Sequence, residues 1–338
     1  MPLDPCTCSR RGFGRHALGC GAFVMAALAA APVATRRAFA AAPAAAPVAT
    51  TPFARVETVA EGVWAVVSTP FGTDGQRGDR TTLSNGGIIA GKDAVLAVEG
   101  FNTPAGADWL AEIAKGLTGR RPTHVVATHY HFDHVGGLAG YQRGAEGPEV
   151  LATARTRDLV VSRYGSGRAE EGKPFKRVAQ RLVLPTLVLP EDGALSSLDL
   201  GGRTVRLRQA SGHTDSDVLV DVPDAGVTFG GDLLWNGIFP NFMDATPSRW
   251  NEAVAQALAD GKTTIVPGHG AVARAADLKP YQDLLALVER VARDGHKAGK
   301  PAEEAAKDFT IPASLGPWTL FSQAFPAGAM AAWYKELG

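Results

Sequence analysis

The segment His129-Tyr130-His131-Phe132-Asp133-His134 places three histidines and one aspartate within six residues. It directly follows the apolar run 123–128, which predicts a buried strand. Imidazole and carboxylate groups are the nitrogen and oxygen donors that Zn²⁺, Fe and Mn accept. A loop of solvated histidines is the alternative, but chance rarely produces this combination. The segment therefore predicts a metal site at the end of a strand.

Three further motifs carry the other candidate ligands, and each ends or follows an apolar run. They are Ser211-Gly212-His213-Thr214, Phe229-Gly230-Gly231-Asp232 and Val266-Pro267-Gly268-His269-Gly270. Each motif alone is weak, because a Gly-His-Thr segment is often a turn and an aspartate after a strand is often a helix cap. An α/β fold gathers functional side chains at strand ends, and glycines let the backbone bend there. We therefore expect the three motifs to join the histidine segment in one site.

The rest of the chain alternates strand and helix patterns. Apolar runs predict strands at 56–67 (turning near 61–62), 86–90, 94–98, 205–207, 218–222, 227–229 and 263–266. Amphipathic spacing predicts helices at 104–117, 152–163, 248–258 and 278–292. Hairpins followed by alternating strands and helices indicate an α/β fold of two sheets covered by helices. We expect one domain over 56–338, with a C-terminal helical tail that carries Trp318, Phe321, Phe325, Trp333 and Tyr334.

The first 55 residues have the pattern of a targeting segment and a linker. Arg10-Arg11 precede Phe13, an Ala-rich apolar stretch follows, and Ala38-Phe39-Ala40 is typical of a cleavage site. The paired arginines resemble a twin-arginine export signal. We expect a signal peptide at 1–40, a linker at 41–55 and a periplasmic or secreted protein. A cytosolic protein with an Ala-rich N-terminus is the alternative.

Composition narrows the class of protein. Of 338 residues, 45% are hydrophobic and 20% are charged, which is ordinary globular composition. Lys plus Arg and Asp plus Glu both number 34, so the basic excess typical of nucleic-acid binders is missing. No run of about eighteen apolar residues follows the N-terminal segment. We therefore expect neither nucleic acid nor a membrane anchor. The cysteines, Cys6, Cys8 and Cys20, all lie in the N-terminal segment, so the mature chain has no disulfide.

Taken together, the motifs resemble the metallo-β-lactamase superfamily. The order is H-x-H-x-D-H, then His, Asp and His, with the family's range of spacings, over about residues 56–275. The resemblance implies a four-layer αβ/βα sandwich with a two-metal cleft at one sheet edge. It implies two zinc ions, with Fe or Mn as alternatives. His129, His131 and His213 would hold the first, Asp133, His134 and His269 the second, and Asp232 would bridge both.

The same resemblance implies a hydrolase for small molecules. A metal-bound hydroxide, oriented by Asp133, would attack the carbonyl of an ester, thioester, lactone or β-lactam. The family's familiar antibiotic-degrading subclass has Cys at the position of Asp232 and Lys about three residues later, where this chain has Trp235. The aspartate is instead similar to that of glyoxalase II-like and lactonase-like members. The sequence leaves the substrate, native metal and oligomeric state open.

Two other functions fit the same motifs. One is an iron-dependent sulfur dioxygenase-like enzyme in which His129, His213 and Asp232 hold a single iron. The other is a periplasmic metal-binding accessory protein without catalytic activity. The complete set of seven ligands favours two metals and hydrolysis.

Four features outside the motifs have two interpretations each. Glu99 stands where the family often has an aspartate that supports the histidine loop. The alternative is that Glu99 is simply a charged residue at the end of a strand. The Gly-rich segment 70–82 is a flap over the cleft or a solvated hairpin. The large apolar side chains of 235–242 form a pocket wall or pack in the core. The basic run 165–181 is solvated surface or attracts an anionic substrate.

Overall fold

The computed structural model describes residues 46–68, 79–143, 146–165, 183–190, 195–259, 261 and 263–338. The compact unit that contains them runs from Ala45 to Gly338. The expected signal peptide, most of the glycine-rich segment 70–82 and nearly all of the basic run 165–181 lie outside the described residues.

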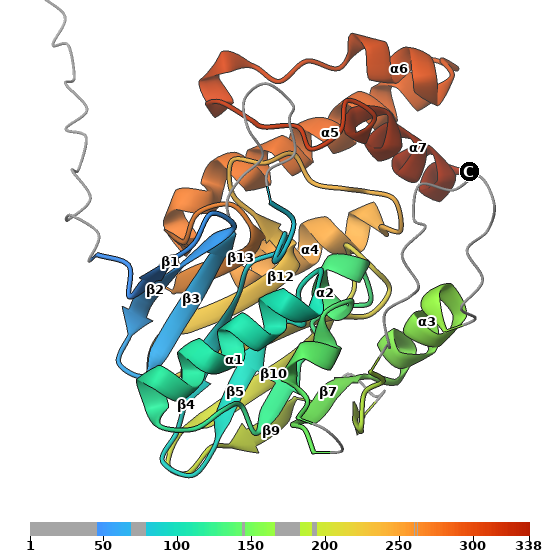
Figure 1. Ribbon diagram of the computed structural model, residues 1–338. Helices are drawn as coiled ribbons and strands as arrows, with labels where there is room; N and C mark the ends of the chain where they lie inside the picture. Colours follow the sequence, from blue (N-terminus) through green and yellow to red (C-terminus); the bar gives the residue numbers. More distant parts are fainter. Residues whose placement is uncertain are drawn as a thin grey trace, which may run out of the picture. The chain divides into compact units, whose positions relative to one another are not determined.

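The first sheet contains eight described strands in sequence order, from β1 to β8 (Figure 1). Neighbouring strands are antiparallel from β1 to β5 and parallel from β5 to β8. The predicted hairpin of β4 and β5 is confirmed, with Gly87 opposite Val98. The strands are β1 (Ala49–Thr50), β2 (Ala54–Ala60), β3 (Val63–Ser68), β4 (Gly86–Ala90), β5 (Val95–Val98), β6 (His124–Val126), β7 (Glu149–Thr153) and β8 (Leu187–Leu189).

The second sheet has the described strand order β14-β13-β12-β11-β10-β9. Its neighbours are antiparallel except for β12 and β13, which run parallel because a helix connects them. This parallel pair brings Asp232 and His269 to the same edge of the sheet. The strands are β9 (Ser196–Asp199), β10 (Thr204–Ala210), β11 (Asp217–Val222), β12 (Val227–Trp235), β13 (Thr264–His269) and β14 (Ala273–Arg274).

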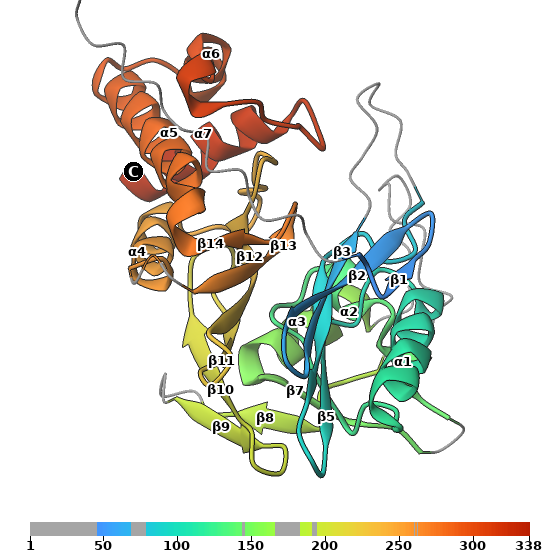
Figure 2. The same cartoon turned by 90° about the vertical axis from the view of Figure 1, so that its left-hand side faces the viewer.

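The two sheets lie face to face (Figure 2), and apolar side chains pack between them. Leu96 from the first sheet and Val220 and Phe229 from the second are almost fully buried in the layer between them. Helix α1 (Pro104–Thr118) covers the outer face of the first sheet, while α4 (Pro247–Ala257) and α5 (Lys279–Lys297) cover the outer face of the second. This order of helix, sheet, sheet and helix confirms the predicted four-layer αβ/βα fold.

Helix α1 shows how local sequence sets an element. Thr103 accepts a hydrogen bond from the Gly106 amide at its start, and Gly119, with φ of 80°, ends it. Leu110 and its alanine neighbours repeat at helical spacing and pack on the first sheet. Burying a leucine side chain of this kind contributes about 1.5–3 kcal/mol.

The C-terminal segment packs on α5. Helix α7 (Phe325–Leu337) buries Met330 and Trp333 in the same apolar cluster as α5. Trp318 and Phe321, however, precede α7 rather than belonging to it. No helix in the described part of the chain is long and apolar enough to cross a bilayer. The remaining short helices are α2 (Phe132–Val135), α3 (Ala154–Tyr164), α6 (Ala302–Asp308), η1 (Leu138–Tyr141), η2 (Ala275–Leu278) and η3 (Ala313–Leu315).

Three boundaries differ from the sequence predictions. Strand β1 and the start of β2 lie inside the expected linker 41–55, since Val48 N donates to Val56 O and joins this segment to the sheet. Residues 152–153, expected to be helical, end strand β7, and Thr153 caps α3 instead. Strand β12 continues through Asp232 rather than ending at Phe229, because a bulge at Gly231 preserves its pairing with β13.

Candidate metal centre

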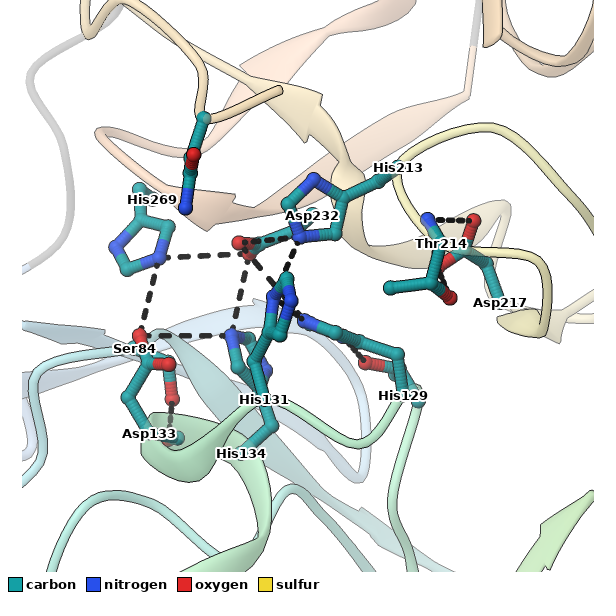
Figure 3. Close-up of polar contacts among 12 residues, drawn as sticks. Ser84, His129, His131, Asp133, His134, His213, Thr214, Asp217, Asp232 and His269 are labelled. Atoms are coloured by element: carbon teal, nitrogen blue, oxygen red, sulfur yellow. Dashed lines mark hydrogen bonds and ion pairs between the residues drawn. The ribbon is translucent and has the colours of Figure 1, made fainter. Parts of the chain in front are cut away.

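Seven side chains from both sheets converge at one place (Figure 3). His129 and His131 follow strand β6, and His213 lies in the loop between β10 and β11. Short helix α2 begins directly after His131 and carries the next two ligands. The structure thus brings together all the ligands predicted from the sequence, in two groups: His129, His131, His213 and Asp232, and Asp133, His134 and His269.

In the first group, three ring nitrogens face one another. His131 Nδ1 lies 3.1 Å from His129 Nε2 and 2.8 Å from His213 Nε2. All three rings meet nearly edge to face. Neutral imidazoles that turn their lone pairs to a common point cannot all satisfy them with hydrogen bonds. The arrangement fits a divalent cation with nitrogen ligands.

The second group mixes nitrogen and oxygen donors. Asp133 Oδ2 lies 3.4 Å from His269 Nε2 and 3.7 Å from His134 Nε2. The side chain of Asp133 is 21% exposed, whereas those of His134 and His269 are buried. A cation held here would therefore be reached from the side of Asp133.

Asp232 faces both groups with different oxygen atoms. Its Oδ1 lies 3.2 Å from His134 Nε2 and 3.4 Å from His269 Nε2. Its Oδ2 lies 3.4 Å from His213 Nε2. Gly268 permits this position, since a Cβ there would lie 2.0 Å from Asp232 Oδ1. The carboxylate thus has the geometry of a bridge between two cations.

Buried polar atoms that make no hydrogen bond indicate whether a metal ion fits the site. Among the described residues, His134 Nε2 and Asp232 Oδ1 are buried and make no hydrogen bond. Unpaired buried polar atoms cost free energy, so natively they pair with a ligand or water. These two atoms face each other in the centre of the donor set. The residues present therefore fit one or two divalent metal ions.

The electrostatics of the cluster also favour positive charge. Burial opposes protonation of His134 and His269, yet Glu99 and Asp232 raise the pKa of His134 well above its usual value, and Asp232 raises that of His269 to about 9. Burial lowers the pKa of His213 to about 3, which keeps this ring neutral and able to donate a lone pair. Carboxylates that attract protons to histidines would equally attract a cation.

Glu99 supports the histidine loop, as the resemblance implied. Its buried carboxylate lies 3.1 Å from His134 Nδ1, and Oε1 accepts a 2.5 Å hydrogen bond from Thr128 Oγ1. Thr128 Oγ1 also lies 3.1 Å from His129 Nδ1. One carboxylate therefore lies against the outer edge of His134 and, through Thr128, against that of His129. Such outer partners orient the rings and raise their basicity as ligands.

Asp244 is a further supporting residue, and sequence reasoning missed it. Its Oδ2 lies 3.2 Å from His131 Nε2 and accepts a hydrogen bond from the Tyr130 hydroxyl. Its Oδ1 accepts a 3.0 Å hydrogen bond from Arg163. Because Asp244 holds Nε2, the Nδ1 atom of His131 points at the other ligands.

Ser84 and Asn85, also missed, join the site to the first sheet. Ser84 Oγ donates to the backbone carbonyl of Asp133 at 2.6 Å. Asn85 Nδ2 donates to the carbonyls of Pro267 and Gly270, which flank His269, and Asn85 Oδ1 accepts from the Ser68 amide. Asn85 thereby ties strand β3 to the end of β13.

The apolar segment 235–242 both packs in the core and contacts the site. Its large side chains are buried against α4 and α5. The Trp235 ring also lies 4.2 Å, centroid to centroid, from the His269 ring. Phe321 of the C-terminal segment meets that His269 ring edge-on at 5.1 Å. The tail, in which the sequence showed no specific chemistry, therefore reaches a candidate ligand.

A profile of the Metallo-beta-lactamase superfamily matches residues 87–269, a range that holds all seven candidate ligands. Acyl-coenzyme A thioesterase MBLAC2 of Homo sapiens is 30% identical over 170 residues, which cover 46% of this chain and 59% of that protein. Hydroxyacylglutathione hydrolase of Erythrobacter litoralis (strain HTCC2594) is 29% identical over 136 residues, covering 40% and 42%. The chain thus spans less than two thirds of the length of these relatives.

Solved structures share the fold. The metallo-beta-lactamase FIM-1 of Pseudomonas aeruginosa, in its mono-zinc form, superposes with a TM-score of 0.54 at 22% identity, over 69% of this chain and 95% of that one. A metallo-beta-lactamase of Hirschia baltica superposes with a TM-score of 0.53 at 23% identity, over 69% and 97%. At this identity the likeness establishes the fold alone.

Proposed function

The chain belongs to the metallo-beta-lactamase superfamily, and from this membership we propose that it is a hydrolase that holds two divalent ions, zinc by preference, and cleaves thioesters. The position of Asp232 carries the proposal, because its two oxygens face two separate groups of ligands. A single cation in one group would leave the other oxygen of this buried carboxylate facing the histidines of the other group.

Two divalent ions in such a pair supply Lewis acidity and lower the pKa of bound water toward neutrality. The side chains of the protein set the geometry around them. Asp133 is partly exposed, and His134 and His269 lower its pKa to about 2 although burial alone would raise it. It therefore stays ionised and can orient an attacking water. The Ser84 hydroxyl already donates to a backbone carbonyl and is not poised as a nucleophile.

Thioesters are the substrate class that the relatives favour. A thioesterase and an acylglutathione hydrolase, by their names, both match this chain. The chain also lacks the Cys and Lys that mark the antibiotic-degrading subclass at and after position 232. No cysteine follows Cys20, so catalysis would not use a thiol nucleophile.

The proposal is tested on the purified chain after loading with zinc. We expect about two equivalents of zinc by mass spectrometry and release of free thiol from acyl-coenzyme A and acylglutathione thioesters. Chelation should abolish turnover, and added zinc should restore it. A chromogenic cephalosporin serves as the matched amide substrate and should turn over far more slowly.

Other outcomes would select the alternatives. One equivalent of iron in the chain as purified, before zinc is added, together with oxygen consumption would establish the sulfur dioxygenase-like function instead. Bound metal without turnover of any thioester, ester, lactone or lactam would leave an accessory metal-binding protein. Rapid cephalosporin hydrolysis would make the enzyme a lactamase. Asp232, in place of Cys, would then only distinguish its subclass from the familiar one.

We also propose that the protein is exported by the twin-arginine route to the periplasm. The paired Arg10 and Arg11, the following apolar stretch and the Ala38-Phe39-Ala40 motif support this proposal. Changing both arginines of the pair to lysine should retain the protein in the cytoplasm, measured by cell fractionation. The same change at Arg36 and Arg37 is the matched control. Export that survives the first change would contradict the proposed route.

A further inference from the structure

A cavity of about 300 Å³ adjoins the ligand cluster. Tyr130, which separates two ligand histidines in the sequence, and Thr214, which follows a third, line its wall. Helix α3 contributes Leu159 and Arg163, and the last turns of α7 contribute Lys335. Its volume falls at the lower end of the range for small-molecule pockets, about 300–1,000 Å³.

The charges of this cavity do not balance. Arg155 pairs with Asp215 at 2.7 Å, and Arg163 pairs with Asp244 at 3.0 Å. Lys335 also lines the cavity and makes no ion pair among the described residues. Three cations against two carboxylates leave one positive charge for an incoming anion. Arginine and lysine together offer both the planar and the point-charge donors that carboxylates and phosphates accept.

The cavity is connected to the metal centre through Asp244. One oxygen of this carboxylate contacts Arg163 in the cavity, and the other contacts His131 Nε2. The Asp244 carboxylate therefore contacts both a cation of the cavity and a ligand of the first group. Tyr130 and Thr214, which also line the cavity, are direct sequence neighbours of candidate ligands.

We propose that this cavity binds a compact anionic substituent, a carboxylate or a phosphate, of the substrate that is cleaved at the metal centre. The inference rests on the proposed hydrolase function and adds the substrate class. Lys335 and Arg163 would hold the anion, while Leu159 and Met243 contact the short alkyl part that carries it. The small volume of the cavity excludes a long fatty acyl chain.

Three thioesters that differ in one charge test the proposal. Butyryl-N-acetylcysteamine is the neutral reference. Succinyl-N-acetylcysteamine carries a carboxylate on the acyl side, and S-butyryl-3-mercaptopropionate carries one on the thiol side. We expect kcat/KM of one charged thioester to exceed that of the reference about tenfold or more, the usual gain from a hydrogen bond to a charged group. The substrate that gains identifies which side enters the cavity.

Substitution of Lys335 tests whether the higher kcat/KM of the charged thioester depends on the cavity. In Lys335→Ala the ratio of kcat/KM for the preferred charged thioester to that for the neutral one should fall about tenfold, and in Lys335→Glu further. Lys307→Ala on α6 removes the same charge from an exposed position away from the cavity and should retain the wild-type ratio. An equal ratio in wild type and Lys335→Ala would overturn the proposal.

A titration without turnover separates this inference from the proposed function. Calorimetry with succinate on the zinc-loaded chain should show binding that Lys335→Ala weakens about tenfold and Lys307→Ala does not. Succinate that binds a metal alone would not respond to Lys335. If no thioester is cleaved, the hydrolase proposal fails and this titration alone decides the cavity. Unchanged succinate affinity in Lys335→Ala would then refute it.

Discussion

Asp232→Ala is expected to lower kcat for thioester hydrolysis by about 10³-fold or more. Removing one stabilising donor from an active site already costs about 10²–10³-fold, and Asp232 would hold both ions of the proposed two-metal site. Without its oxygens, the two groups of histidines no longer contact a common carboxylate. Metal analysis should show the loss of at least one equivalent. Activity and metal content should therefore fall together.

The fold of this variant should persist, so its loss of activity can be attributed to the site. The Asp232 carbonyl still accepts the hydrogen bond from Trp235 Nε1 at 2.6 Å, and the apolar cores do not include the carboxylate. Asp224→Ala, at an exposed ion pair with Arg203, is the matched control and should keep full activity and metal. Wild-type turnover in Asp232→Ala would show that the reaction takes place elsewhere in the protein.

The candidate ligands were predictable because each stands in a short motif with its own chemistry. His129, His131 and His134 are close in the chain, and glycines mark the bends at His213 and His269. Parallel strands then place distant motifs at one edge, as β12 and β13 do. Local periodicity likewise sufficed for the β4–β5 hairpin and for α1, whose caps and apolar spacing lie in adjacent residues.

Asp244 and Phe321 could not be predicted as residues that contact the ligands, because the histidines they contact are far away in sequence. Asp244 lies 113 residues beyond His131 and stands between Met243 and Ala245 without any recognisable pattern. Phe321 reaches His269 from a segment beyond the family match, which ends at residue 269. The end of β12 was predicted too early for the same reason. Its last residues are determined by pairing with β13 across a bulge and not by their own periodicity.

Glu99→Gln should weaken metal binding at the second group by about 10–100-fold, the usual cost of losing an outer partner of a ligand. Glutamine keeps the length of the side chain and can still accept from Thr128 Oγ1. It removes the negative charge that lies 3.1 Å from His134 Nδ1 and, with Asp232, raises the pKa of that histidine. The measurement is a competition titration with a chelator that reports each zinc equivalent separately.

Glu99→Ala should also lower the stability of the fold. This effect separates the role of Glu99 as a hydrogen-bond acceptor for Thr128 from its role in metal binding. Without the carboxylate, the amide and hydroxyl of Thr128 lose a buried acceptor, at about 1–3 kcal/mol for each unsatisfied group. The free energy of unfolding of the metal-free protein should fall by that order, whereas Glu99→Gln should retain most of it. Glu112→Gln, at an exposed carboxylate paired with Arg121, is the control for both measurements.

The backbone at Glu99 makes aspartate an informative third variant. Glu99 has φ of 76° and Phe101 has φ of 60°, a region that residues other than glycine seldom adopt and that Asp and Asn tolerate best. Glu99→Asp should therefore be accepted by the backbone, but its shorter side chain reaches less far toward His134. If Glu99→Asp and Glu99→Gln both bind two zinc ions as tightly as wild type, Glu99 supports the histidine loop but does not contribute to metal affinity. A loss of the second zinc in both would show that the carboxylate must have both its charge and its reach.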